Sequence, residues 1–430
     1  MIGIVGAGIS GLVLGHELVG LGADVVLWEA AGRPGGVLWS QDCGGVRVEL
    51  GPQRARLTDG FRTLVEAIGL SDELVTAPVD LPLFVFARGK LRPAPLTVRQ
   101  AIATELLPLA STIRILTEPF RSGLRAGETA GAFLRRKFGE TAYTDLLGPL
   151  YGGLYGSDPD RMPARHGLAR TLESMGVGRS ILWRMIRAGG RADEAPPCSF
   201  QEGLAALPRA LKGRLGDRVH LNTPVRSLRR NRDGWEVILD DDQSARVSQV
   251  VLTCPADRAA KIVEDVSSEG AAVLAGIRYN RLAVVQMRSP ADLYGLGYQV
   301  ALGEPLETRG VTWNHSLFGR SGLYTAYLGG MKSPSMVDRP DKEIGGIACR
   351  EFQSVTGYAA ETLMVSRTRM PAWDESWDAL ALLELPAGVH LCSNYSARPG
   401  IAGRIVEAQR LARRLTASQP GVPEVSPPFG

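Results

Sequence analysis

The stretch MIGIVGAGISGLVLGHELVGLGADVVLWEA, residues 1–30, decides the fold of this chain. A short apolar run leads into the glycine pattern GxGxxG, apolar residues then recur at helical spacing, and a second apolar run ends at an acidic residue. This order predicts a strand, a helix and a second strand, which is the βαβ unit that opens a doubly wound sheet.

The three glycines of the pattern have separate physical tasks. Gly6 permits the tight turn from strand to helix, Gly8 lets the backbone approach a diphosphate, and Gly11 lets the helix pack closely on the strand. The diphosphate would lie at the helix N-terminus, where free N–H groups and the helix dipole favour negative charge. Glu29 ends the second strand, where its carboxylate can accept hydrogen bonds from both ribose hydroxyls and would repel a 2′-phosphate. The motif therefore predicts a dinucleotide other than NADP.

The composition is that of a globular protein with two or three domains. The 430 residues are 44% hydrophobic and carry a formal net charge of +4, spread thinly along the chain, so we expect no nucleic-acid partner. The 5 cysteines include no CxxC pair and the 5 histidines show no ligand spacing, so we expect neither a disulfide framework nor a metal site. The first residues lack the basic segment of a secretory signal, and no apolar run is long enough to span a bilayer. We therefore expect a cytoplasmic protein, at most peripheral on the inner face of the cell membrane.

The rest of the chain divides by its hydrophobic pattern. From about residue 70 to 190 the pattern is helical, in segments such as TVRQAIATELLPLAST (97–112) and ETAGAFLRRKFGETAYTDLLGPLY (128–151). From residue 199 a predicted helix, FQEGLAALPRALKGRLG (200–216), precedes several short strands up to about residue 330. A last strand, a charged amphipathic helix and a Pro-rich end, ASQPGVPEVSPPFG (417–430), complete the chain.

Four further segments concern the nucleotide. EAAGRPGGVLWS (29–40) follows the acid, and VELGPQRAR (48–56), LNTPVRSLRR (221–230) and VHLCSNYSARPGIAGRIVEAQRLA (389–412) come later in that order. They resemble the R-x-G-G, E-x-G-P, adenine-contacting and C-terminal flavin segments of the FAD-binding amine oxidase superfamily. The resemblance implies that the dinucleotide is FAD, with the isoalloxazine ring at the N-terminus of the last helix.

The resemblance also implies which residues contact FAD. From the opening βαβ unit these are Gly6, Ala7, Gly8, Ile9, Ser10, Gly11, Glu29 and Ala30. From the later segments they are Arg33, Gly35, Gly36, Gly51, Pro52, Val225, Asn394, Gly400, Ile401 and Ala402.

The middle of the chain resembles one branch of the superfamily. Residues 117–174, which include EPF, FLRRKFG and LYGSDPD, together with SFQEGLAALPRAL (199–211) and AYLGG (326–330), are similar to the protoporphyrinogen oxidase family. The resemblance implies oxidation of a porphyrinogen to the porphyrin in heme biosynthesis, with hydride transfer to flavin N5 and reoxidation by oxygen. Since the flavin carries this chemistry, we expect no catalytic side chain.

A flat macrocycle with acidic edges needs a wide apolar pocket with cations at its rim. The segments that match the family's pocket make the following residues the substrate candidates: Leu296, Gly297, Tyr327, Arg88 and Arg92, with Arg125 as a further cation. Leu83 stands where the family often has a basic residue, and the C-terminal flavin segment departs from the family's pattern at Gly403–Ala408. The choice between protoporphyrinogen IX and coproporphyrinogen III therefore stays open.

The implied fold class is α/β, with a Rossmann-like FAD-binding domain of the glutathione reductase and amine oxidase type, a mixed α+β substrate domain and a helical insert. We predict the FAD-binding domain at residues 1–75, 199–270 and 365–430, the insert at 76–198 and the substrate domain at 271–364. Residues 97–124 are apolar with flanking arginines, so a face that lies on a membrane is an alternative to a buried helix.

Two other functions stay open. One is that of a flavin amine oxidase or desaturase, and the other is a porphyrin-binding flavoprotein without catalysis. A homodimer is open as well.

Overall fold

A five-stranded parallel sheet carries the segment that opens the chain. The computed structural model describes residues 1–78, 80–95, 97–153, 156–174, 176–177, 180–187, 195–396 and 400–417. The strands of this sheet, in spatial order, are β10 (Val219–His220), β2 (Val25–Trp28), β1 (Ile2–Val5), β14 (Gln249–Leu252) and β20 (Val389–Leu391). Helix α1 (Ile9–Gly20) connects β1 to β2, so the predicted strand–helix–strand unit is confirmed.

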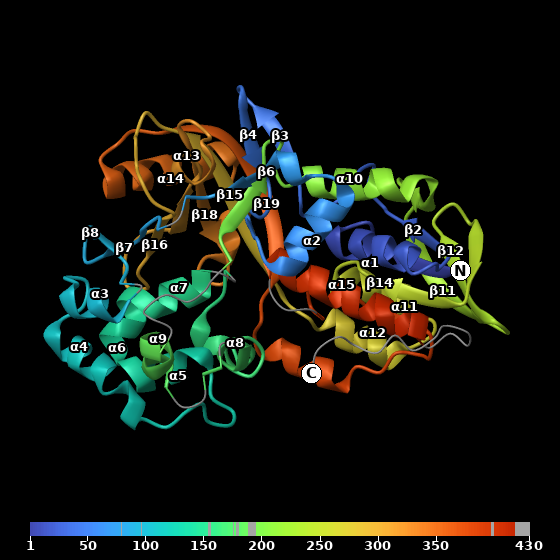
Figure 1. Cartoon of the computed structure of the whole chain (residues 1–430), viewed down its shortest axis with the longest axis horizontal. Helices are drawn as coiled ribbons and strands as arrows, with labels where there is room; N and C mark the ends of the chain where they lie inside the picture. Colours follow the sequence, from blue (N-terminus) through green and yellow to red (C-terminus); the bar gives the residue numbers. More distant parts are fainter. Residues whose placement is uncertain are drawn as a thin grey trace.

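The two faces of the parallel sheet are covered by different elements. Ile2 and Ile4 of β1 point to a face that is covered by α1, α2 (Asp59–Ile68), α10 (Ala206–Leu215) and α15 (Gly400–Ala417) (Figure 1). Val5 points to the opposite face. The elements packed there are β11 (Val225–Asn231), β12 (Gly234–Leu239), β13 (Ser244–Val247), α11 (Ala256–Val263) and α12 (Ser268–Ala275).

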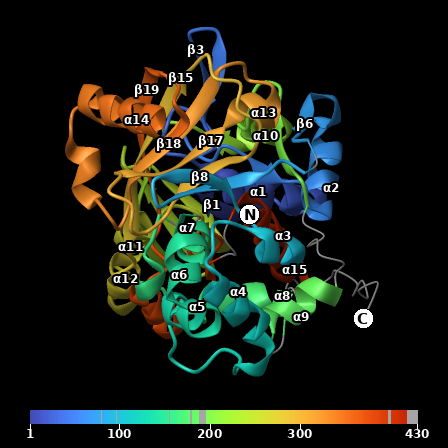
Figure 2. The ribbon, with the colours of Figure 1, turned by 90° about the vertical axis from the view of Figure 1, so that its left-hand side faces the viewer.

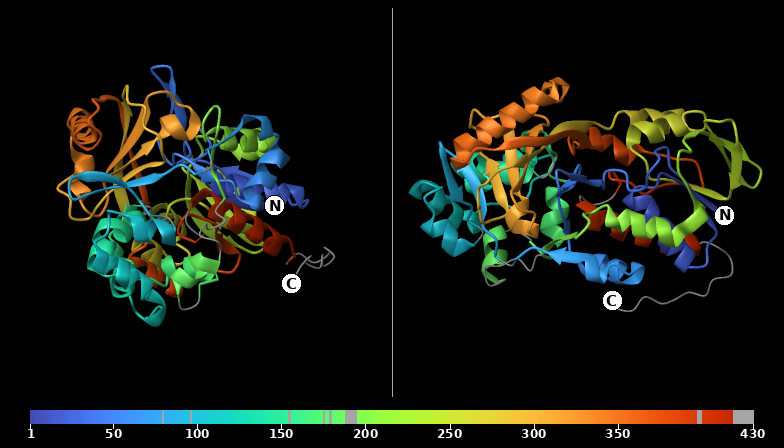
Figure 3. Two further views of the ribbon diagram at one scale, coloured as in Figure 1. Left: turned by 60° about the vertical axis from the view of Figure 1, so that its left-hand side comes forward. Right: turned by 90° about the horizontal axis from the view of Figure 1, so that it is seen from above.

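A seven-stranded mixed sheet forms the second half of the molecule (Figure 3). Its strands, in spatial order, are β19 (Glu361–Pro371), β15 (Tyr279–Arg288), β18 (Leu323–Gly329), β17 (Thr308–Trp313), β16 (Gly297–Val300), β7 (Leu83–Ala87) and β8 (Lys90–Pro93). Val285, Val311 and Ala326 alternate onto a face that packs on α14 (Asp341–Thr356). The opposite face is more polar, because it presents Gln286, Thr312 and Thr325.

Two small sheets and one short helix complete the β-rich part. The hairpin of β3 (Ser40–Cys43) and β4 (Val46–Glu49) is fastened to the large sheet, because Gln286 Nε2 donates to the carbonyl of Glu49 at 2.6 Å. The remaining elements are β5 (Ala55–Arg56), β9 (Pro197–Phe200) and β6 (Leu74–Thr76), which pair in that order, and α13 (Asn314–Phe318).

A group of short helices lies against the seven-stranded sheet (Figure 2). They are α3 (Val98–Ala103), α4 (Leu109–Leu116), α5 (Ala130–Phe138), α6 (Glu140–Ala142), α7 (Gly148–Gly153), α8 (Leu168–Ser174) and α9 (Ile181–Arg187), with a π-helical turn at Tyr143–Leu147. The two long helical segments of the sequence are interrupted at identifiable residues. Thr104 is extended and Pro108 precedes α4, while Gly139 ends α5 at a φ of 93°.

Two secondary-structure predictions were wrong. Residues 74–93 were expected to be helical but form β6, β7 and β8, because FVFARGKL places a tight turn at Arg88–Gly89 between two runs with β propensity. The helix expected from residue 200 begins at Ala206, because Phe200 ends β9 and Gly203 turns the chain at a φ of 80°.

The domain limits stay predictions, but one predicted boundary falls inside a strand. Strand β19 pairs with β15 from Glu361 to Pro371, so a boundary at residue 365 would cut through a single strand of the large sheet. Most of the Pro-rich end, and residues 397–399 of the C-terminal flavin segment, lie outside the described residues.

No helix within the described ranges combines the length and the apolar character needed to cross a membrane.

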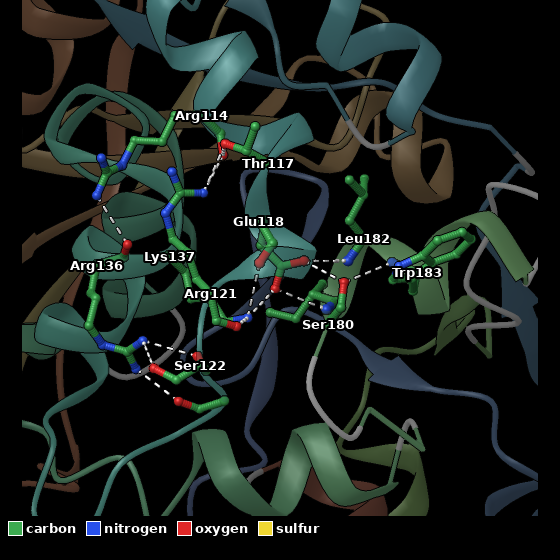
Figure 4. A network of polar contacts seen from close by, with 12 residues as sticks. Arg114, Thr117, Glu118, Arg121, Ser122, Arg136, Lys137, Ser180, Leu182 and Trp183 are labelled. Carbon is green, nitrogen blue, oxygen red and sulfur yellow. Dashed lines mark hydrogen bonds and ion pairs between the residues drawn. The ribbon is translucent and has the colours of Figure 1, made fainter.

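A buried ion pair organises the helical group (Figure 4). Lys137 of α5 and Glu118 of η2 (Glu118–Phe120) have fully buried side chains, and Lys137 Nζ lies 2.6 Å from Glu118 Oε1. The same carboxylate accepts hydrogen bonds from the Ser180 hydroxyl and from the amides of Ile181 and Leu182, both at 3.3 Å. One carboxylate therefore joins η2, α5 and the first turn of α9.

We predict that Lys137→Met lowers the free energy of unfolding by about 3–5 kcal/mol, because it leaves the Glu118 carboxylate buried without a cation. The double variant Lys137→Met/Glu118→Gln should recover more than half of this loss, since it leaves no buried charge and the amide oxygen can still accept from the Ser180 hydroxyl and the Leu182 amide. Urea unfolding followed by circular dichroism measures both changes.

Arg281→Met is the matched control, because Arg281 and Asp338 form an ion pair in which both side chains are more than half exposed. Such a pair contributes about 1 kcal/mol or less. A Lys137→Met variant as stable as this control would show that the buried pair does not hold the helical group together.

Candidate active site

The turn between β1 and α1 is shaped by glycines. Gly6 has a φ of 106°, which favours glycine over residues with a Cβ. A Cβ on Gly11 would lie 2.1 Å from the carbonyl oxygen of Gly6, so only glycine permits this approach of helix to strand. A Cβ on Gly8 would meet nothing within 4 Å, so the N-terminus of α1 faces open space.

The Glu29 carboxylate lies beside this turn. Glu29 Oε2 accepts a hydrogen bond from the amide of Ala7 at 2.7 Å, and Oε1 accepts from the amide of Ala31 at 2.9 Å. Each oxygen keeps a lone pair after these bonds, so the carboxylate is held in place and can still accept from a ligand. The Glu29 carbonyl accepts from the amide of Thr223, two residues before Val225 at the start of β11.

The second glycine segment runs along the same turn. The amide of Gly35 donates to the carbonyl of Ala7 at 2.8 Å, and a Cβ on Gly36 would lie 3.4 Å from the Cα of Gly8. Arg33 Nη2 donates to the carbonyl of Gly36 at 2.9 Å, and its guanidinium stacks on Trp39. The R-x-G-G segment therefore borders the open space at Gly8.

The E-x-G-P segment also packs closely. A Cβ on Gly51 would lie 2.1 Å from the carbonyl oxygen of Val37, and Pro52 follows it half-buried. The structure therefore brings residues 6–11, 29–36 and 51–52 together.

The last helix begins at the same edge of the parallel sheet. Strands β1 and β20 run in the same direction through β14, and each is followed by its helix, so α1 and α15 both start at the carboxyl edge. Gln409 of α15 donates to Glu17 of α1, which agrees with two parallel helices side by side. Neither helix has an acidic residue in its first turn, so both N-termini can receive an anion.

Asn394, Gly400, Ile401 and Ala402 surround the start of α15. Asn394 Oδ1 accepts a hydrogen bond from the Tyr279 hydroxyl at 3.3 Å, and Gly400 opens the helix at a φ of 86°. Ile401 is buried in the core between the helices and the parallel sheet, and Ala402 is half-buried.

Arg404 was not among the cofactor residues predicted from the sequence. Burial lowers the pKa of its guanidinium to about 10, a shift that Tyr279 opposes, and yet the side chain keeps accessible surface. Within the described part of the chain, Arg404 has neither a hydrogen bond nor an ion pair. Its guanidinium is therefore half-buried and can still donate to a ligand. The only sequence signal was its position inside the segment that departs from the family pattern.

Comparison with known proteins identifies this nucleotide-binding fold. The sequence profile described as flavin containing amine oxidoreductase matches residues 9–414. The chain belongs to this family. Its cofactor is therefore FAD, it is an FAD-dependent oxidoreductase, and the predicted α/β fold class is confirmed.

Curated relatives are similar over most of their length. Protoporphyrinogen oxidase 1 of Spinacia oleracea is 26% identical over 397 residues, which are 82% of this chain and 70% of the relative. Coproporphyrinogen III oxidase of Staphylococcus aureus is 24% identical over 419 residues, which are 86% of this chain and 87% of the relative. The expected resemblance to the protoporphyrinogen oxidases is confirmed.

A solved structure agrees in fold. The protein from Exiguobacterium sp. 255-15, provisionally assigned as a protoporphyrinogen oxidase, superimposes with a TM-score of 0.78 at 21% identity. The superposition covers 97% of this chain and 99% of that one.

The groups that FAD needs are present in this member of the family. The diphosphate requires backbone amides and positive charge without a competing side chain. The open space at Gly8, the two helix N-termini without acids in their first turns and the unpartnered Arg404 meet that requirement.

The polar face of the seven-stranded sheet contains the substrate candidate Tyr327. Tyr327 of β18 pairs with Gly310 of β17, and its hydroxyl lies 3.3 Å from Thr312 Oγ1. Gly297 of β16 pairs with Thr312, so Tyr327 and Gly297 lie on either side of β17. Burial raises the pKa of the Tyr327 phenol, although the side chain is only half-buried by accessible surface. Tyr327 therefore lies half-buried on the polar face of the large sheet.

Arg54, two residues after Pro52, lies near Tyr327. Burial lowers the pKa of the Arg54 guanidinium and the Tyr327 phenol opposes this shift. Arg54 has no hydrogen bond or ion pair among the described residues, and it keeps accessible surface. A half-buried cation without a partner among the described residues therefore lies near Tyr327. The sequence showed this arginine next to the motif, but nothing in the sequence showed where its side chain points.

The other substrate candidates are placed differently. Leu296 packs in a small apolar cluster with Leu317 and Phe318 and is not on the polar face. Arg88 lies in the turn between β7 and β8, where it donates to the carbonyl of Leu106 and pairs with Asp145 at 3.4 Å. Arg92 donates to the carbonyl of Ala87 at 2.9 Å. These arginines already have protein partners, and their contact with substrate stays a prediction.

Groups of three or more His, Cys, Asp or Glu side chains arranged to hold a metal do not occur in the described ranges. The expectation that the site has no metal stays a prediction.

Proposed function

We propose that this protein oxidises a porphyrinogen to the porphyrin, as a step of heme biosynthesis. The observation that supports it most is the half-buried, unpartnered Arg54 guanidinium near Tyr327. The relatives of this chain are named for protoporphyrinogen and coproporphyrinogen, whose acidic side chains such a cation would bind. A porphyrinogen is a large, mostly apolar ring with acidic side chains. An internal cation favours such a substrate by charge and leaves its ring to the apolar and aromatic walls.

The same cation disfavours the alternative of an amine oxidase. An amine substrate is an ammonium ion in water, and burying it near Arg54 would place two positive charges in a medium of low polarity. The family is named for amines, but the positive charge of Arg54 would repel an ammonium substrate in this member.

FAD, when bound, supplies the acceptor for a hydride from the macrocycle. We propose that the cofactor is held by the residues chosen from the sequence, with Gly8 beside its diphosphate, Glu29 at its ribose and the start of α15 at its ring. Arg404 adds positive charge there. Tyr327, Gly297 and Arg54 orient the substrate on the polar side of the large sheet.

We also propose that α4 and η2 lie on an anionic membrane surface. Leu109, Ile113 and Leu116 follow one another on one side of α4 and are exposed, and Phe120 of η2 is 83% exposed. Arg114 and Arg121 lie beside them, so cations flank an apolar face, as in proteins that bind membrane surfaces. Oxygen as the electron acceptor and a homodimer stay predictions.

The Gly8→Ala variant tests the cofactor site. The new Cβ meets no protein atom and the φ of −70° suits alanine, so the stability of the FAD-free protein should not change. The methyl group should instead keep the diphosphate away from the backbone and lower FAD retention at least tenfold, measured as flavin absorbance after desalting.

Gly20→Ala is the matched control, because Gly20 is also on α1 and its Cβ would also meet nothing. Equal flavin content in the two variants would rule out contact between Gly8 and the cofactor.

The substrate assignment is tested by anaerobic reduction of the bound flavin. We expect coproporphyrinogen III or protoporphyrinogen IX to bleach the flavin absorbance, and putrescine and benzylamine to leave it unchanged. Arg54→Met should raise the KM for the porphyrinogen about tenfold or more, since a lost hydrogen bond to a charged group is worth roughly 1.5–3 kcal/mol. Bleaching by an amine and not by either porphyrinogen would refute the proposal.

The membrane proposal is tested by co-sedimentation with vesicles of phosphatidylglycerol and phosphatidylcholine. The double variant Ile113→Ser/Phe120→Ser should lose most of the bound fraction, because it removes two exposed apolar side chains from the proposed face. Leu382→Ser, at a residue that is 76% exposed on η7 (Glu375–Leu382), is the control and should bind as the unmodified protein does. Equal binding of both variants would contradict the proposal.

A further inference from the structure

A polar cavity of about 380 Å³ lies where the helical group meets the large sheet. The charged and phenolic side chains that line it are Arg135, Tyr143, Asp158, Asp160, Arg309 and Lys332. Arg135 is on α5 and Tyr143 begins the π-helical turn. Asp160 is in η4 (Pro159–Arg161), and Asp158 directly precedes it. Arg309 is on β17, and Lys332 follows β18. None of them was chosen from the sequence as a site residue.

A β-bulge turns Arg309 towards this cavity. In the pairing of β17 with β18, Thr308 lies opposite Leu328 and Gly310 lies opposite Tyr327, so Arg309 is an extra residue without a partner. Such a bulge bends the strand and re-aims a side chain. Thr308 and Gly310 are buried, while Arg309 between them keeps accessible surface. The bulge therefore directs a guanidinium into the cavity, one residue from the strand pair that carries Tyr327.

Part of the charge in the cavity is already neutralised. Arg135 binds Asp160 with two nitrogens, and the Tyr143 hydroxyl donates to the same carboxylate at 3.1 Å. Asp158 Oδ1 accepts from the amide of Asp160 at 3.0 Å, as the cap of η4. Asp158 is then the one acid of the lining that faces the two remaining cations.

Those two cations share one acid of the lining, Asp158, and neither forms an ion pair with it. Arg309 has no hydrogen bond or ion pair within the described part of the chain, and burial lowers the pKa of its guanidinium while Asp158 opposes the shift. Burial and the neighbouring Arg309 lower the pKa of Lys332, although Glu307, Glu351 and Glu304 oppose this. Lys332 Nζ donates to the carbonyls of Glu304 and Leu306 at 3.2 and 3.1 Å, so one of its three N–H groups remains.

The nearby acids are occupied by other donors. The Glu351 carboxylate accepts from the amides of Glu307 and Thr308 at 2.9 and 2.8 Å, and the Glu307 carboxylate accepts from Ser333 at 2.6 Å. Of the side chains that line the cavity, three are positive and two are negative. The half-buried Arg309 guanidinium has no acceptor among the described residues and keeps accessible surface, so a carboxylate in the cavity can accept from it.

We propose that Arg309, with Lys332 at the rim, binds a carboxylate of the substrate and so fixes one acidic edge of the macrocycle. This inference rests on the proposed function. A guanidinium presents two parallel N–H groups that match a carboxylate, whereas an ammonium acts as a point charge. The volume is at the lower end of the roughly 300–1,000 Å³ of ligand pockets, so the cavity suits an acidic side chain and one edge of the ring.

The test compares two ligands that differ only in charge. Coproporphyrin III has four free carboxylates, and its tetramethyl ester has none. The binding of each to the FAD-loaded protein is measured by fluorescence titration in the same detergent. We expect Arg309→Met to weaken the binding of the free acid by about 10- to 100-fold, to leave the binding of the ester unchanged and to raise KM more than it lowers kcat. Arg309→Lys should restore only part of the affinity, because lysine lacks the fork of two donors.

Arg281→Met is the control, since Arg281 is on the same sheet and its partner Asp338 is at the surface. This variant should bind both ligands as the unmodified protein does. Equal loss for the acid and the ester in Arg309→Met would show a packing role and overturn the carboxylate assignment, as would no loss for either. An unmodified protein that binds neither ligand would overturn the proposed function itself, whereas one that binds both and is insensitive to Arg309 would overturn only this inference.

Discussion

The contact between α1 and the carbonyl of Gly6 is the constraint on which the rest of the structure depends. With a hydrogen atom in place of a side chain at Gly11, the helix approaches the end of β1 to a distance that any Cβ would prevent. The N-terminus of α1 is thereby placed directly at the carboxyl edge of the sheet, with open space at Gly8. Three further segments lie near that edge: residues 29–36, 51–52 and 400–404. A cofactor site of this kind is a property of backbone geometry first and of side chains second.

The part of the molecule governed by local pattern could be predicted from the sequence. The βαβ unit, the glycine roles and the final helix follow from periodicity and from a motif whose physics is local. The hairpin of β7 and β8 was missed because the apolar run at residues 83–87 is short, and such a run does not distinguish a strand from part of a helix. Only the neighbouring strand β16, more than 200 residues later in the chain, settles their conformation.

The charged residues inside the molecule were the hardest to predict. Arg88 and Arg92 looked suitable because they are basic and near a family segment, but the fold gives both of them backbone carbonyls as partners. Arg309 gave no signal, because a β-bulge is a mismatch between two strands and cannot be seen in either strand alone. Arg54 and Arg404 stand inside motifs, and what singles them out is the lack of a partner, which only a structure can show.

Some buried charges in this protein are paired, such as Lys137 with Glu118 in the helical group and Arg320 with Glu49 of β4, and others are not. In the helical group, Lys137 and Glu118 neutralise each other, and both oxygens of the carboxylate accept hydrogen bonds. This pair is therefore structural and needs no ligand to complete it. By contrast, three half-buried arginines have no partner among the described residues: Arg54, Arg309 and Arg404. A chain that buries cations in this way is less stable alone than with anions that complete them, because a ligand that binds only the folded state stabilises it. The diphosphate of FAD and the carboxylates of a porphyrinogen are anions of the required kind. Half-buried cations without protein partners therefore favour anionic ligands over cationic ones, since a second positive charge beside them would raise the electrostatic cost.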